Sequence, residues 1–171
     1  LQSKGVEPST PMVSLFVGLR GTPEELELPK RNFWCFPSWD HDQNCKVSRL
    51  SLSLPPPCLP STNAKKDYEM GDVDSPPAFF VSFPAAKERT WVDRWGDKSV
   101  ALVLAPAPYE LFEKFEGGRV KHRGDEYLAL KKRFENSLIA MLYTQLPQLK
   151  GKVAYVDVGS PLSNNYYLGT Q

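Results

Sequence analysis

Asp40, His41 and Asp42 form the densest group of acid–base side chains in the sequence, directly after an aromatic stretch. Carboxylates and imidazole are common metal ligands and proton carriers, so one interpretation is a metal or acid–base site. The other is a turn whose Asp side chains bind their own backbone. Neighbouring side chains on an extended chain point to opposite faces and would not converge on one ion. The turn is therefore favoured, and we predict no metal site.

The stretch Val153–Gly169 is a second candidate, close to the C-terminal end of the sequence. It opens with alternating β-prone residues, breaks at Gly159-Ser160-Pro161, and continues into two asparagines and two tyrosines. A strand, a tight turn and an aromatic segment in this order predict a loop held at the edge of a sheet, where it could face a ligand.

Basic residues gather in Gly118–Arg123 and again in Lys131-Lys132-Arg133. A phosphate-binding interpretation exists, because cations pair with phosphate oxygens. Asp125, Glu126 and Glu135 are interleaved with them, however, so a solvated face is favoured. The formal net charge of the whole chain is +1, so no global field draws in nucleic acid or an anionic membrane, and we expect no nucleic-acid partner.

The composition indicates one globular domain of 171 residues, with 41% hydrophobic and 24% charged residues and 16 prolines. There is no apolar run of about 18 residues that would span a bilayer. Leu1–Gly5 lacks an initiator Met and the apolar core of a signal peptide, which indicates an internal start. Cys35, Cys45 and Cys58 are too few and too irregular for a disulfide framework, which favours reduced thiols.

Nucleotide-binding and hydrolase motifs are absent from the sequence. It contains no Gly-x-Gly-x-x-Gly, no P-loop, no Gly-x-Ser-x-Gly and no His-Glu-x-x-His. Without the glycine-rich turn, these 171 residues by themselves should not hold the ADP half of FAD or NAD. We therefore predict that the chain has no self-sufficient active site.

Hydrophobic periodicity predicts an α+β fold, with a mixed β-sheet, one long amphipathic helix and short helices. The long helix is expected over Asp125–Leu146, about 33 Å in length. Short helices are expected after Thr22, which with Glu25 forms a capping box, and at Tyr109–Glu116. The predicted strands are Met12–Leu19, Asn32–Pro37, Ala78–Phe83, Val100–Ala105 and the stretch that begins at Val153. The long helix suffices for a right-handed crossover if the last two strands are parallel.

Three regions follow from the composition. Residues 1–44 and 77–171 carry the predicted elements, and residues 45–76 form a Pro/Ser-rich loop or insertion, long for a compact domain.

Several segments, in order, resemble the retinol saturases, which are related to the carotenoid isomerases and phytoene desaturases. They are Phe16–Leu26, Asn32–Asp42, Pro77–Lys87, Lys121–Tyr127, Gln148–Val153 and Gly159–Leu168. The resemblance implies a fragment of the substrate-binding part of a two-domain FAD-dependent oxidoreductase, with the FAD-binding domain absent from this chain. It implies reduction of a conjugated double bond in all-trans-retinol or a related retinoid or carotenoid. NAD(P)H is a candidate electron donor.

The resemblance also implies an apolar isoprenoid substrate, location at the endoplasmic reticulum membrane, and membrane association through parts outside this chain. Residues 45–69 depart from the family pattern and suggest an insertion or a mispredicted splice.

Site residues follow from the same resemblance. Substrate-binding candidates are Phe79, Phe80, Phe83, Tyr166 and Tyr167, because a polyene tunnel needs apolar and aromatic walls. Asn164 is the cofactor-binding candidate, and no catalytic residue is assigned. Ordinary core is the alternative for the phenylalanines, and turn structure is the alternative for the other three.

Other functions stay open beside this one. They are a carotenoid isomerase-like protein, a truncation product without independent stability, and a non-catalytic interaction domain that uses the proline segment with Trp91 and Trp95.

Overall fold

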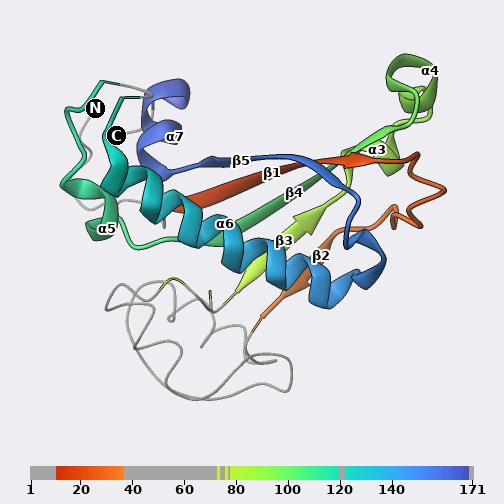
Figure 1. Ribbon diagram of the computed structural model, residues 1–171, viewed down its shortest axis with the longest axis horizontal. Helices are drawn as coiled ribbons and strands as arrows, with labels where there is room; N and C mark the ends of the chain where they lie inside the picture. Colours follow the sequence, from red (N-terminus) through yellow and green to blue (C-terminus); the bar gives the residue numbers. More distant parts are fainter. Residues whose placement is uncertain (1–10, 37–72, 74–75, 77, 120–121, 170–171) are drawn as a thin grey trace, which may run out of the picture.

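The computed structural model describes residues 11–36, 73, 76, 78–119 and 122–169 (Figure 1). The Asp40–Asp42 turn, Cys45, Cys58 and the proline segment lie outside these residues, as does almost all of the loop predicted over 45–76.

A five-stranded sheet forms the centre of the protein, in the order β2-β3-β4-β1-β5. Its strands are β1 Met12–Arg20, β2 Phe33–Cys35, β3 Phe79–Ser82, β4 Lys98–Pro106 and β5 Val153–Gly159. The α+β class is confirmed. Each of the four pairings among these strands is antiparallel, whereas the residue pattern predicts a mixed sheet. β4 and β5 nevertheless run in the same direction, because both pair antiparallel with β1, which lies between them.

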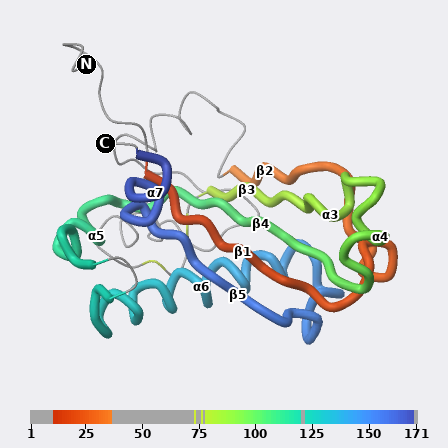
Figure 2. The backbone as a smooth tube through the Cα atoms, turned by 90° about the horizontal axis from the view of Figure 1, so that it is seen from above, coloured from red at the N-terminus to blue at the C-terminus, as the bar shows by residue number. Residues whose placement is uncertain are grey.

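The long helix predicted from the sequence is α6, Asp125–Gln145, which connects β4 to β5 and lies across one face of the sheet (Figures 1 and 2). The remaining helices in the described ranges are short. They are α3 Pro84–Lys87, α4 Trp91–Trp95, α5 Glu110–Glu113, the 3-10 turn η1 Pro147–Leu149, and α7 Pro161–Leu168. None of the helices in the described ranges is long and apolar enough to cross a bilayer.

The core lies between α6 and the sheet face that it covers. Alternate residues of β1 point into it because side chains of a strand alternate between faces, and Leu15 and Val17 are at most 1% exposed. On α6, Phe134 is fully buried and stacks on Phe112, with ring centroids 5.7 Å apart. Burying each such side chain contributes roughly 1.5–3 kcal/mol, so this layer holds α6 on the sheet.

The capping box predicted after β1 is present, but it does not start a helix. The backbone N–H of Thr22 donates to Glu25 Oε2 at 2.9 Å, and that of Glu25 donates to Thr22 Oγ1 at 3.2 Å. Glu27 then adopts a φ of +50°, in the left-handed region, so the helical turn ends there. The segment is a capped turn that leads into β2.

Candidate functional site

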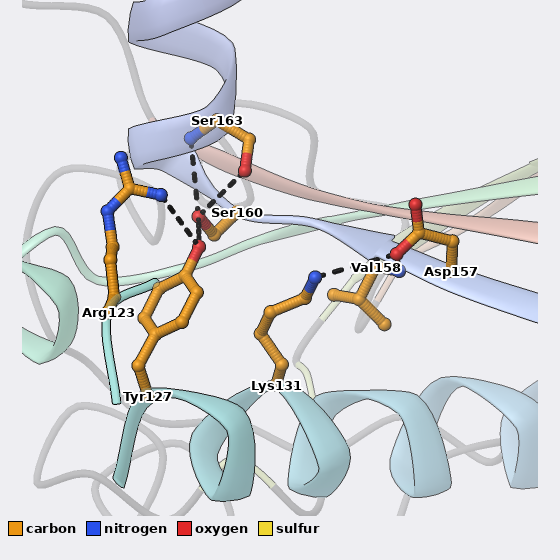
Figure 3. A network of polar contacts seen from close by, with 7 residues as sticks. All are labelled: Arg123, Tyr127, Lys131, Asp157, Val158, Ser160 and Ser163. Atoms are coloured by element: carbon orange, nitrogen blue, oxygen red, sulfur yellow. Dashed lines mark hydrogen bonds and ion pairs between the residues drawn. The ribbon is translucent and has the colours of Figure 1, made fainter. Parts of the chain in front are cut away.

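Within the described part of the chain, no helix spans the sheet face opposite α6, and α7 rises at one end of that face (Figure 3). Several of its side chains are nevertheless large and apolar or aromatic: Phe16 is 50% exposed, Trp34 is 64% exposed and Tyr155 is 63% exposed. We call this surface the open face and define it by Phe16, Trp34, Phe80, Leu102, Leu104 and Tyr155. Contiguous exposed apolar side chains of this kind mark a surface that binds something.

The strand register places the open-face residues in rows across the sheet. The first row runs through Trp34, Phe80, Leu104, Ser14 and Gly159. The ring of Trp34 packs on that of Phe80, with centroids 4.5 Å apart, and stacks on Phe36 at 5.8 Å. The second row contains Ser82, Leu102, Phe16 and Asp157. Strands are about 4.8 Å apart, so a row across five strands offers a surface roughly 19 Å wide.

Gly18 shapes the third row of the open face, where it lies opposite Tyr155 on β5. A Cβ at position 18 would lie 3.3 Å from the Cβ of Tyr155, closer than ordinary van der Waals contact. The register between β1 and β5 shifts directly after Gly18, which adds a bulge at this point. The glycine therefore lets Tyr155 lie close to β1.

Polar groups lie at both ends of the second row. On the β5 side, Asp157 accepts from the backbone N–H of Val158 at 2.8 Å and from Lys131 Nζ at 3.5 Å (Figure 3). On the β3 side, Lys87 Nζ donates to Ser82 Oγ at 2.8 Å and to Asn32 Oδ1. We call the group of Lys87, Ser82 and Asn32 the polar corner.

Helix α7 begins directly after the first row and rises from Ser160 away from α6 (Figure 3). Ser160 caps it, Pro161 occupies its first turn, and Gly169 ends it with a φ of 63°. Each is the residue that helix ends favour. The residue pattern predicts a loop here, and this segment is a helix of eight residues instead. The prediction that it starts at the edge of the sheet is confirmed.

A buried network fixes the start of α7 (Figure 3). The hydroxyls of Tyr127 and Ser160 lie 2.6 Å apart, and Ser160 Oγ also accepts from the backbone N–H of Ser163 at 3.3 Å. Arg123 Nη1 donates to the Tyr127 hydroxyl at 3.5 Å, while its buried Nε has no hydrogen-bond partner in the structure. This network joins the first turn of α6 to the first turn of α7.

The residues predicted to bind substrate divide between core and surface. Phe80 lies on the open face, whereas Phe79 and Phe83 are 5% and 0% exposed and belong to the core. Adjacent strand residues point to opposite faces, so Phe79 and Phe80 separate. Tyr166 and Tyr167 are 63% and 65% exposed on α7. The binding role of these five residues stays a prediction.

The asparagines of α7 hold the helix to its neighbours. Asn164, the cofactor-binding candidate, donates through Nδ2 to the backbone carbonyl of Met12 at 3.1 Å. Asn165 Nδ2 donates to the hydroxyl of Tyr109 at 3.5 Å. Burial raises the pKa of Tyr109, and so do its hydrogen bond to Glu116 and the negative charge of that residue. The cofactor role of Asn164 stays a prediction beside this structural contact.

Sequence reasoning missed most of the open face, including Phe16, Trp34, Leu102 and Leu104. The signal in the sequence is the alternation of side chains along β1 and β4. An antiparallel sheet needs to bury only one of its faces, so every second residue of these strands can be exposed. Within the described ranges, no group of three His, Cys, Asp or Glu residues could hold a metal ion.

The two tryptophans predicted to be exposed for an interaction surface, Trp91 and Trp95, both lie on α4, and Trp91 is half-buried. Trp95 is 50% exposed, and α4 buries none of its residues. Trp91 is hydrogen-bonded to the start of β4, because its Nε1 donates to the backbone carbonyl of Lys98 at 2.6 Å.

Comparison with known proteins identifies relatives over nearly the whole chain. It is 35% identical over 163 residues to the all-trans-retinol 13,14-reductase of Rattus norvegicus and 34% identical to that of Homo sapiens, with 95% of the chain covered in each case. It is also 26% identical over 160 residues to a Danio rerio protein named inactive all-trans-retinol 13,14-reductase. No family model matches the chain. The chain spans about a quarter of the length of these relatives. The resemblance found in the motifs is thus confirmed: over nearly its whole length, the chain is similar to one segment of the all-trans-retinol 13,14-reductases.

Proposed function

We propose that this chain is part of an oxidoreductase that reduces a conjugated C=C bond of all-trans-retinol or a related retinoid or carotenoid. In this proposal the open face is one wall of the substrate site. The observation that carries it is the row formed by exposed Trp34 and half-buried Phe80 and Leu104, on a sheet face that no described helix spans. The similarity to the all-trans-retinol 13,14-reductases supports the choice of substrate class.

A flat aromatic and aliphatic surface suits a polyene, which is itself flat and apolar. Burying apolar area contributes about 25 cal/mol per Å², without any need for directional contacts along the hydrocarbon chain. Covering this face also excludes water from the double bonds. The rigidity of the sheet would then hold one face of the polyene in a fixed orientation, which favours reaction at a defined position.

Reduction of a C=C bond adds a hydride and a proton, and FAD is the cofactor that the family resemblance implies for the hydride. The residues of this chain do not fit that cofactor, because the sequence lacks the glycine-rich turn for its ADP half. We therefore assign the flavin to polypeptide other than these 171 residues and confine this chain to binding and orienting the substrate.

Substitution on the open face tests the proposal in the full-length enzyme. Leu104→Asp places a charge in the first row and should raise the KM for all-trans-retinol at least about tenfold, because apolar contact with the polyene is lost. Leu128→Asp is the matched control, since Leu128 is 56% exposed on the outer side of α6. If the two variants have the same KM for all-trans-retinol, the open face is not part of the substrate site.

A second candidate, a non-catalytic interaction domain, is favoured by one observation, the exposed Trp95 on α4. In that case Trp95→Ala should abolish capture of a protein partner while Leu104→Asp leaves it intact. The opposite pattern, loss with Leu104→Asp alone, would count against α4.

A further inference from the structure

The polar corner carries a positive charge that no acidic group in the described residues neutralises. The ammonium of Lys87 donates to Ser82 Oγ at 2.8 Å and to Asn32 Oδ1, and both acceptors are neutral. The ion pairs found in the described part of the chain involve other cations, namely Arg94, Lys114, Lys131 and Lys132. An ammonium group has three N–H donors, so one remains available to a ligand.

This ammonium lies at the end of the aromatic part of the open face. Ser82 lies two residues beyond Phe80 on the same side of β3, or roughly 7 Å along the strand. Leu102 of β4 is directly opposite Ser82, and Trp34 packs on Phe80. A single cationic donor therefore borders an otherwise apolar strip.

Lys87 is exposed in the structure, so a molecule that covers this strip as far as Ser82 displaces water from the ammonium. Desolvating a charged donor is costly unless the covering molecule offers an acceptor in return. A hydrocarbon surface alone would leave the third N–H unsatisfied. The best match is an apolar body with one accepting oxygen at its end, which is the chemistry of a polyene alcohol.

We propose that Lys87 is a specificity-determining residue that binds the terminal hydroxyl oxygen of a polyene alcohol lying on the open face. This inference rests on the proposed function. Ser82 and Asn32 hold the ammonium in place, and its third N–H donates to the alcohol oxygen. The isoprenoid body extends from there over Phe80 and Trp34. A hydrogen bond from a charged donor is about twice as strong as a neutral one, so it distinguishes the alcohol from the bare hydrocarbon.

The test compares two ligands on the full-length protein. One is all-trans-retinol, and the other is the hydrocarbon of the same skeleton, with a methyl group in place of the terminal CH2OH. Binding is followed by quenching of tryptophan fluorescence. Lys87→Met removes the charge while keeping the length of the side chain. It should weaken retinol binding roughly 10- to 100-fold and leave hydrocarbon binding within about twofold.

Lys150→Met is the matched control, because Lys150 is exposed in the turn between η1 and β5. Lys87→Arg, which keeps a charged donor, should retain much of the preference for the alcohol. If Lys87→Met weakens both ligands equally, or neither, while the unmodified protein binds both, the inference is overturned and the proposed function stands. If the unmodified protein binds neither ligand, the proposed function fails, and the inference fails with it.

Discussion

Replacing Ser160 by alanine should destabilise the protein through two separate losses. Ser160 is fully buried, and its Oγ caps α7 by accepting from the N–H of Ser163. Loss of such a cap costs about 1 kcal/mol. Tyr127 is only 4% exposed, and its hydroxyl would lose the Ser160 hydroxyl, its partner at 2.6 Å. It would keep only the contact with Arg123 at 3.5 Å. A buried hydroxyl left without its partner costs about 1–3 kcal/mol. The sum is roughly 2–4 kcal/mol.

Two related variants separate these losses. Tyr127→Phe removes one hydrogen bond but leaves Ser160 Oγ engaged with Ser163, so it should cost only about 1 kcal/mol. In the double variant Tyr127→Phe/Ser160→Ala the Tyr127 hydroxyl is absent and cannot be left unpaired, so its cost should be smaller than the sum of the single costs. Ser163→Ala is the control, because its Oγ makes only a 3.4 Å contact with Ser160 Oγ.

Urea unfolding of the four variants, followed by circular dichroism, measures these free energies. Similar values for Ser160→Ala and Ser163→Ala would refute the reasoning, and so would strictly additive costs in the double variant. Either result would mean that the Tyr127–Ser160 contact does not hold α7 on the sheet.

Three further predictions concern the core, the open face and alkaline pH. Phe134→Ala should lower the free energy of unfolding by about 3–5 kcal/mol in urea titrations, and Leu128→Ala by under about 0.5 kcal/mol, because only the former is buried. Gly18→Val should cost roughly 1–3 kcal/mol in the same assay, because its side chain meets Tyr155, and an unchanged midpoint would be contrary evidence. Burial first, and then Glu116, raises the pKa of Tyr109 above 10.0, so its contribution to stability is present below pH 10.0 and is lost as the pH rises through the folded-state pKa. In Tyr109→Phe the free energy of unfolding should therefore depend less on pH in that range. An unaltered slope would count against this role of Tyr109.

The strands and the long helix could be predicted because their signals are local. The apolar runs at β1 and β4 are long enough to require burial, and α6 shows a sustained helical period. The order of the strands, in contrast, depends on contacts between residues that are far apart in the sequence. β1 pairs with both β4 and β5, at sequence distances that no periodicity encodes.

Helix α7 was missed although its end signals are present in the sequence. Ser160 and Pro161 are residues that begin helices, and Gly169 is one that ends them. The Gly159-Ser160-Pro161 run is equally typical of a tight turn, and eight residues are too few for periodicity to decide between the two.

The candidate site was only partly accessible for a similar reason. A strand such as Phe79–Ser82 alternates in any sheet, but which of Phe79 and Phe80 faces the core depends on where α6 packs. No sequence pattern indicates a binding role for Lys87, because its contacts with Asn32 and Ser82 form only when β2 and β3 pair.

The central claim is that the open face contacts the polyene. Photocrosslinking the full-length protein with a diazirine analogue of all-trans-retinol, followed by peptide mass spectrometry, tests it most directly. Labels are expected on Phe16, Trp34, Phe80, Leu102, Leu104 or Tyr155, with competition by unmodified retinol. Labelling that unmodified retinol competes away, but that lies only outside the open face with none of these six residues modified, would contradict it.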